Sequence, residues 1–106
     1  MTFTREDYEM AAMAAGMRID PGLDGMDAVA IIEGVLRRWN PLTDDGDALR
    51  LAIKLGLYLN MPGLEVGYRV DHVTHIERIV LIGDGLEAAT RRAIFRAAVA
   101  VGRAMS

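Results

Sequence analysis

The sequence has no cysteine, which excludes disulfides, thiol catalysis and zinc sites built from thiolates. Histidine occurs twice and serine once, at position 106, so the side chains of a hydrolytic triad are scarce. No apolar run approaches the ~20 residues of a membrane-spanning helix, and none near the start resembles a signal peptide. We therefore expect a cytoplasmic protein that is not an enzyme and holds no cofactor.

Aromatic residues are also few, at 6% of the chain, whereas hydrophobic residues as a whole make up 52% and include seven methionines. Small and flexible apolar side chains let helices approach closely and repack at interfaces. The length of 106 residues is typical of one domain, so we expect a single domain over residues 1–106.

Acidic and basic residues are unevenly distributed. The net charge is −3, but residues 1–47 hold ten acidic and four basic residues, whereas residues 48–106 hold five and eight. The basic half is compatible with nucleic-acid binding. An ordinary solvated surface explains the same bias, and the overall acidity favours that interpretation.

The first predicted helix begins at Thr4, which is placed to cap it, with Asp7 in the capping-box position. It should run to about Ala15 and end at Gly16, a residue suited to the left-handed position after a helix. Its later part has no polar side, and a helix that is apolar all round must be covered all round. We expect a second subunit to cover it, in a homodimer, through four residues: Tyr8, Met10, Met13 and Met17.

Residues 18–27 are rich in aspartate, glycine and proline and are predicted to form a loop. Residues 27–39 have two interpretations. Their apolar residues recur at helical spacing, whereas their β-branched residues and a turn-like Glu33-Gly34 favour two short strands. Glycine inside a helix would cost about 1 kcal/mol, which also favours the strands.

A second helix should follow the Asn40-Pro41 turn, with Thr43 or Asp44 as its cap and Gly56 at its end. Acidic residues in its first turn complement the helix dipole. Its polar stripe consists of three residues at helical spacing, Asp47, Arg50 and Lys54. The other faces are apolar, so this helix is predicted to be mostly enclosed.

Residues 64–71 alternate between apolar and polar, which predicts a strand with one solvated face. A turn at residues 71–74 leads to a return strand over residues 76–82. The end of that strand, Ile79-Val80-Leu81-Ile82, is continuously apolar, which is typical of a strand covered on both faces. A last helix from Leu86 to about Met105 follows. Together these elements predict an α+β fold, an antiparallel sheet of about three to five strands packed with three helices in an α/β sandwich.

Three groups of residues invite a ligand-binding interpretation, and each has a structural alternative. The acidic residues 44–47 lack the bidentate glutamate of a calcium loop, and helix capping explains them. His72, His75 and Glu77 lack the spacing of a zinc motif, so turn and sheet positions are favoured. Gly83-Asp84-Gly85 precedes a helix as a phosphate-binding loop does, but its aspartate puts negative charge where phosphate would lie. We predict no metal site and no nucleotide site.

An alternative function, nucleic-acid binding, depends on the last predicted helix. Three of its arginines share one stripe: Arg92, Arg96 and Arg103. Trp39, with Arg37 and Arg38 before it, would be able to stack on a base. A tryptophan beside a proline turn is more often a hydrophobic plug, and these arginines bind nucleic acid only where they are free of internal partners.

Two motifs, residues 39–56 (Trp39-Asn-Pro-Leu-Thr-Asp-Asp-Gly-Asp through Gly56) and residues 87–98, resemble a family of small phage and prophage proteins of unknown function, the phage ABA-sandwich domain family. Together they cover somewhat under a third of the chain. The resemblance implies an α/β sandwich and a phage or prophage origin in a bacterial cytoplasm, and it implies no catalytic residue, cofactor or partner. The family's signature positions occur here as Trp39, Pro41, Asp44, Asp47, Arg91 and Arg92. We expect them to form a turn, helix caps and an arginine pair that reaches the acidic first turn of the second helix.

The sequence therefore predicts a phage or prophage accessory protein of unknown function. We expect a non-catalytic module that binds a second copy of itself or a host or phage protein. The nucleic-acid-binding interpretation is the alternative.

Overall fold

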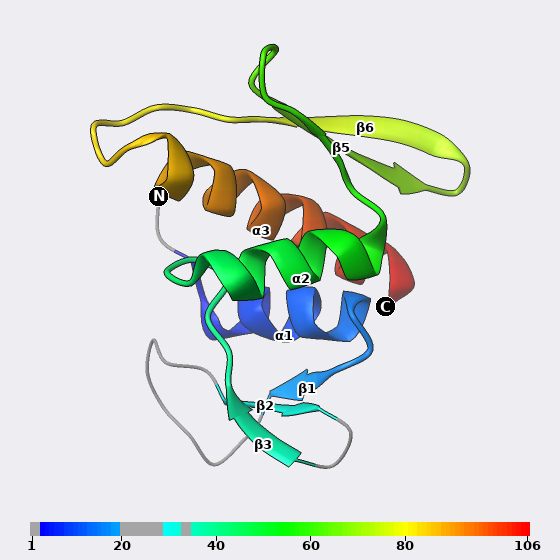
Figure 1. Cartoon of the computed structure of the whole chain (residues 1–106). Coiled ribbons are helices and arrows are strands. Elements are labelled where there is room, and N and C mark those ends of the chain that lie inside the picture. Colours follow the sequence, from blue (N-terminus) through cyan, green and yellow to red (C-terminus); the bar gives the residue numbers. More distant parts are fainter. Residues whose placement is uncertain (1–2, 20–28, 33–34) are drawn as a thin grey trace.

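Residues 3–19, 29–32 and 35–106 are described by the computed structural model (Figure 1). These residues form three helices, α1 (Arg5–Ala14), α2 (Asp45–Leu55) and α3 (Leu86–Met105). They also form six short strands, β1 (Arg18–Ile19), β2 (Val29–Ile32), β3 (Val35–Arg38), β4 (Tyr58–Asn60), β5 (Glu65–Val70) and β6 (Val73–Arg78). This composition confirms the predicted α+β class and the three predicted helices.

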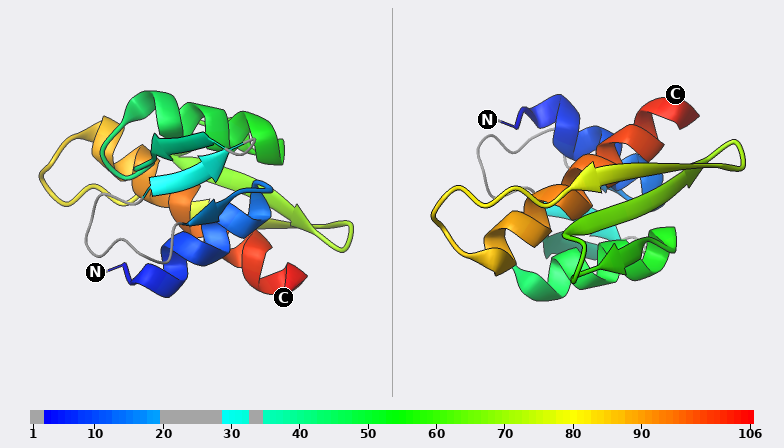
Figure 2. Two further views of the ribbon diagram at one scale, coloured as in Figure 1. Left: turned by 90° about the horizontal axis from the view of Figure 1, so that it is seen from below. Right: turned by 90° about the horizontal axis from the view of Figure 1, so that it is seen from above.

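The strands pair in two antiparallel sheets rather than in the single sheet that the sequence predicts. β1, β2 and β3 form one sheet in that order, and β4, β5 and β6 form the other. The three helices lie between the two sheets (Figures 1 and 2). The strands are separated because α2, which joins β3 to β4, carries the chain across the helical layer.

The strand interpretation of residues 27–39 is confirmed by β2 and β3, whose predicted turn at Glu33-Gly34 lies outside the described residues. β1 lies in the stretch that the sequence predicts as a loop, and its Arg18 pairs with Ile31. The loop prediction is therefore wrong for this two-residue strand, because its partner is distant in sequence. The rest of the predicted loop, residues 20–27, lies outside the described residues.

The capping box predicted at the start of α1 is confirmed. Thr4 Oγ1 accepts the backbone N–H of Asp7 at 3.2 Å, and Thr4 N–H donates to Asp7 Oδ2 at 2.9 Å. At the other end Gly16 takes the left-handed conformation with φ of 75°, and Met17 N–H donates to the Ala12 carbonyl at 2.8 Å. The chain therefore turns sharply out of α1 toward β1.

The first and last helices, α1 and α3, touch backbone to backbone. A Cβ atom added at Gly102 would lie 2.0 Å from the carbonyl oxygen of Met10, so only glycine fits at this crossing. One turn away, the guanidinium of Arg103 donates to the Asp7 carboxylate at 3.0 Å. The sequence predicts that a second subunit covers the apolar faces of α1. Much of this cover is instead provided by α3 of the same chain.

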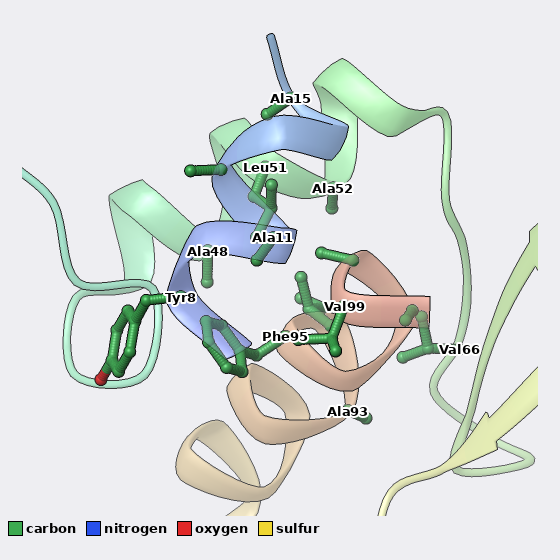
Figure 3. Close-up of a cluster of buried hydrophobic side chains, with 14 of the residues drawn as sticks. Tyr8, Ala11, Ala15, Ala48, Leu51, Ala52, Val66, Ala93, Phe95 and Val99 are labelled. Atoms are coloured by element: carbon green, nitrogen blue, oxygen red, sulfur yellow. The ribbon is translucent and has the colours of Figure 1, made fainter. Parts of the chain in front are cut away.

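Phe95 lies at the centre of the core. Its ring centroid is 4.8 Å from that of Phe3 and 4.9 Å from that of Tyr8. Side chains of all three helices and of β5 point toward one another around it (Figure 3). Alanines supply most of the buried helix positions, which lets the helices lie close together and explains how so few aromatic residues suffice.

A hydrogen-bonded junction connects β3 to α2. Asn40 Oδ1 accepts the backbone N–H of Leu42 at 3.1 Å, and Asn40 N–H donates to Asp47 Oδ2 at 2.9 Å. Asp44 is the cap of α2, as one of the two predicted candidates, and its Oδ2 accepts Asp47 N–H at 2.8 Å. Arg91 of α3 donates to the Leu42 carbonyl at 2.9 Å.

The prediction that both Arg91 and Arg92 reach the first turn of α2 is correct only for Arg91. Arg91 forms an ion pair with Asp45 in the first turn of α2, as predicted. Arg92 instead pairs with Asp84, which precedes α3. The acidic residues of the 44–47 segment are thus used as caps and ion-pair partners, which supports the structural interpretation of that segment over a calcium loop.

We expect Asp44→Ala to lower the free energy of unfolding by about 1 kcal/mol, because alanine cannot accept the N–H at the start of α2. Urea denaturation followed by circular dichroism measures the change. Asp44→Asn is the matched control, since asparagine also caps helices, and it should recover most of the loss. Equal stability of the alanine and asparagine variants would contradict the capping role.

The prediction that α2 is mostly enclosed is wrong for one of its faces. Ala48, Leu51 and Ala52 are buried, but Leu49 is 53% exposed and Ile53 is 70% exposed. The helix packs against α3 on one side, and the apolar residues that do not face that side remain at the surface. One face of α2 is therefore both apolar and exposed.

Candidate protein-binding surface

A group of exposed apolar residues follows one border of the second sheet. β6 is the edge strand of that sheet, because β5 lies between it and β4. Five large apolar residues of β6 and the segment after it are 52–68% exposed: Val73, Ile76, Val80, Leu81 and Ile82. We call β6 together with residues 79–82 the apolar edge.

The apolar edge corrects a prediction of the sequence analysis. The return strand ends at Arg78 rather than at Ile82, and of residues 79–82 only Ile79 is buried. The continuous apolar run indicates a strand covered on both faces, yet no part of the described chain covers its last three residues. Ile79 N–H still donates to the Leu64 carbonyl at 2.9 Å, but residues 80–82 belong to no strand and have no partner strand within the described residues.

The turn before β6 fixes the position of the edge. Asp71 and His72 have φ of 52° and 68°, and Val70 pairs directly with Val73. Two central residues with positive φ are typical of a type I′ turn, whose twist matches that of the paired strands. The hairpin of β5 and β6 therefore continues beyond the ends of the helices, as the view from above shows (Figure 2, right).

Two arginines of α3 hold the apolar edge in place. Arg96 donates to the Arg78 carbonyl at 2.7 Å and pairs with Glu77 at 3.3 Å. Arg92 donates to the Val80 carbonyl at 3.2 Å and binds the Asp84 carboxylate. This hydrogen bond from Arg92 lowers the pKa of Asp84 below its ordinary value. The edge is thus a fixed surface and does not depend on a partner strand for its position.

The histidines that the sequence analysis weighed as metal ligands lie in this hairpin. His72 occupies the turn, and the ring of His75 stacks on Tyr68 with centroids 5.2 Å apart. Burial, together with the charge of Glu77, raises the pKa of the Tyr68 hydroxyl. Within the described residues no three metal-ligating side chains gather in one place. The hairpin positions predicted for both histidines agree with the structure.

The predicted interface on α1 is placed differently. Tyr8 is only 4% exposed and packs its ring against Trp39 and Phe95 in the core, so it is not a surface contact. Met10 and Met17 are half-buried against the core, and Met13 is half-buried as well. The contact role of the three methionines stays a prediction, while Tyr8 is a core residue.

The four residues of the nucleic-acid interpretation all have internal roles. Trp39 is 4% exposed and forms part of the core, as its alternative interpretation proposed. Arg92 and Arg96 hold the apolar edge, and Arg103 binds Asp7 at 3.0 Å. Arginines engaged in this way have little capacity left to neutralise phosphates. The geometry therefore disfavours nucleic-acid binding by this helix.

Sequence reasoning overlooked the apolar edge as a binding surface because it assigned the run of residues 79–82 to the core. The signal was present in that run, since four consecutive apolar residues need cover from some neighbour. Among the helices in the described part of the chain, none has the length and apolarity that crossing a bilayer requires.

Comparison with models of known protein families, with curated proteins and with solved structures gives no match. The resemblance of residues 39–56 and 87–98 to a phage protein family stays a prediction.

Proposed function

We propose that this chain is a non-catalytic binding module that associates with a second copy of itself through the apolar edge. The observation that carries the proposal is the exposure of Val80, Leu81 and Ile82, which are 53%, 58% and 68% exposed in the isolated chain. Removing partly exposed side chains of this size from water stabilises an interface by roughly 1 kcal/mol each. In a symmetric dimer each of these residues is buried on both copies, so its contribution to the free energy of association is doubled.

The backbone of β6 supports strand pairing as the form of this contact. In an antiparallel hairpin closed by a two-residue turn, the pair next to the turn is hydrogen-bonded, and alternate residues then direct their N–H and C=O groups away from the partner strand. Thr74 and Ile76 are such residues of β6. An edge strand with outward backbone groups readily pairs with another strand.

The charges of β6 favour one register for that pairing. When a two-fold axis relates two antiparallel edge strands, one residue lies opposite itself. With Ile76 on the axis, His75 lies opposite Glu77 of the second copy, and Thr74 lies opposite Arg78. No like charges face each other in this register, and the apolar Val73 meets Ile79.

Neighbouring registers are less favourable. An axis through Glu77 or through Arg78 would place two identical charges side by side, which costs stability in a sheet. The register centred on Ile76 also brings residues 80–82 of one copy against the hairpin tip of the other, residues 70–72. Both parts of the apolar edge are then covered by one symmetric contact.

We expect the wild-type chain to be a dimer and the double variant Ile76→Glu, Leu81→Glu to be a monomer. In the register centred on Ile76, the carboxylate at position 76 would face its copy across the axis and the one at position 81 would lie opposite Asp71. Association should therefore weaken at least a hundredfold, which corresponds to about 3 kcal/mol. Multi-angle light scattering after gel filtration, at protein concentrations from about 5 to 200 µM chosen to bracket a micromolar Kd, measures the mass directly.

Ile53→Glu is the control, because Ile53 is exposed to an even greater extent, at 70%, but lies on α2. It should leave the dimer intact, and circular dichroism should show that every variant is folded. A wild-type chain that is monomeric throughout the concentration range contradicts the proposal. So does a dimer that Ile53→Glu disrupts and the edge variant does not.

The proposed module fits an accessory protein of a phage or prophage, in which binding rather than catalysis is the activity. That origin is supported by the motif resemblance of residues 39–56 and 87–98. The genes that flank the coding sequence test it, since a phage accessory gene is expected to lie among other phage genes.

A further inference from the structure

A cleft lies where the end of α1, β3 and α2 meet. The β1–β3 sheet beside it and the sheet that carries the apolar edge lie on opposite sides of the helices (Figure 2). It has a volume of about 540 Å³ and is bordered by the end of α1, the end of β3 and one face of α2. Small-molecule sites typically have volumes of about 300–1,000 Å³. The cleft is thus large enough for a ligand of ten to twenty non-hydrogen atoms, on the order of what such volumes hold.

The rim of the cleft is strongly cationic. Arg37 and Arg38 come from β3, and Lys54 lies opposite them on α2, next to Arg50. The residues that line the cleft include one carboxylate, Asp47. The polar stripe of α2 and the arginines before Trp39, which the sequence places far apart, therefore face one space.

Most of this positive charge is uncompensated. Asp47 already binds Arg50 at 2.8 Å and accepts the backbone N–H of Asn40 at 2.9 Å. Within the described part of the chain, the side chains of Arg37, Arg38 and Lys54 have neither a hydrogen bond nor an ion pair. The four arginines of α3 and Arg50 all have acidic partners, whereas these three cations around one cavity have none among the described residues.

The floor of the cleft is apolar. Trp39 and Leu51, which are buried in the core, reach it with their outer edges, and Ala15 and Met17 complete it beside the turn that ends α1. A cavity with an apolar floor and a few convergent charged groups is the usual form of a small-ligand site. Its groups match a ligand that is apolar at one end and anionic at the other.

We infer that this cleft binds a small organic anion, a carboxylate or phosphate carried on a flat apolar body. The apolar body lies in the part of the cleft lined by Ala15, Met17, Trp39 and Leu51, and the anionic group is held by Arg37, Arg38 and Lys54. Guanidinium groups bind carboxylates and phosphates through paired, charge-assisted hydrogen bonds. No carboxylate competes for these three cations within the described residues, because Asp47 is held by Arg50.

A compact anion fits better than a nucleic-acid strand. The cleft borders a second hollow of about 400 Å³, which is lined by the carboxylates of Asp44 and Asp47 and by Arg38 and Arg50. Arg50 is already paired with both carboxylates, so a second phosphate along a strand would find only Arg38 among these lining cations. Trp39 is also too deeply buried, at 4% exposure, to stack face to face with a base.

The single tryptophan makes the inference directly testable, because only one indole N–H signal appears in a ¹⁵N–¹H correlation spectrum. We expect 2-naphthoate to shift the Trp39 signal saturably, with a Kd below about 1 mM, the affinity of a weak but specific small ligand. Neutral 2-naphthamide, which has the same ring system, should bind at least tenfold more weakly. A thymidine hexanucleotide at ~50 mM salt should cause no saturable shift.

The double variant Arg37→Gln, Arg38→Gln should bind 2-naphthoate at least tenfold more weakly, since it loses two charge-assisted bonds. Lys54→Gln, which alters only an exposed side chain of α2, is the second variant should the double variant fail to fold. The matched control is Arg5→Gln, Arg69→Gln, which removes the same charge far from the cleft and should bind as the wild type does.

Three results would overturn the inference. Equal affinity for the naphthoate and the naphthamide would show that the cations make no contact with the ligand. Equal weakening by the control variant would indicate a general charge effect. A hexanucleotide that binds more tightly than the naphthoate, and loses affinity in the cleft variants, would assign the cleft to nucleic acid.

Discussion

Gly102→Ala is expected to lower the free energy of unfolding by about 3 kcal/mol. The sign is unusual, because replacing glycine by alanine inside a helix ordinarily stabilises a protein by about 1 kcal/mol. Here the added methyl group would lie 2.0 Å from the carbonyl oxygen of Met10 and 2.6 Å from its carbonyl carbon. Both atoms belong to the backbone of α1, so α1 and α3 have to move apart and loosen the alanine contacts beside the crossing.

Urea denaturation of the variant and the wild type measures this effect. Gly46→Ala in α2 is the matched control, since a Cβ atom there meets only the movable end of the Arg50 side chain and the Asp44 carboxylate at 3.1–3.2 Å. The control should be as stable as the wild type or more so. If Gly102→Ala were neutral or stabilising, the close contact of α1 and α3 would not exist in solution.

Phe95→Ala should cost about 3–5 kcal/mol, the usual range for deleting a fully buried phenylalanine. The ring joins α3 to Phe3 and Tyr8, with centroid distances of 4.8 and 4.9 Å. Most of the other buried side chains of the helices are alanines. A methyl group cannot change its rotamer to fill the cavity that the missing ring would leave. Thermal unfolding followed by circular dichroism measures the loss.

Phe95→Leu is the control for this second variant. Leucine keeps most of the buried apolar area, so it should cost well under half as much as alanine. A similar loss in both variants would indicate that the aromatic contacts rather than the filled volume stabilise this part of the core. A loss below about 1 kcal/mol for alanine would mean that Phe95 is not central to the core.

The ends of the helices were predictable from sequence because they are local. Thr4 with Asp7, and Asp44 before α2, each satisfy backbone groups within three residues of themselves, and Gly56 takes the left-handed position directly after α2. Such arrangements are encoded in short stretches and depend little on the rest of the chain. The strands of residues 29–38 were predictable for a similar reason, namely their β-branched residues.

The division into two sheets was not predictable in this way. Which strands pair depends on where α2 carries the chain, and no residue pattern within a strand records its neighbour. The same limit explains why β1 was missed, since its two residues become a strand only through pairing with β2. Non-local pairing decides both outcomes.

The candidate surface shows the limit most clearly. The run from Ile79 to Ile82 predicts cover on both faces, and sequence alone does not say whether the cover comes from the same chain or from another. The cleft shows the converse, because Arg37 and Lys54 belong to separate motifs whose convergence only the fold reveals. Patterns identify which residues need a neighbour, and the topology identifies the neighbour.

The contact of α1 with α3 has a consequence for how the chain acquires its structure. Asp7 and Arg103, which bind each other, are 96 residues apart. At typical rates of synthesis a ribosome takes on the order of ten seconds to make that length. During this interval the alanine face of α1 lacks its contact with α3. The core of this domain is therefore completed only after α3 has been synthesised.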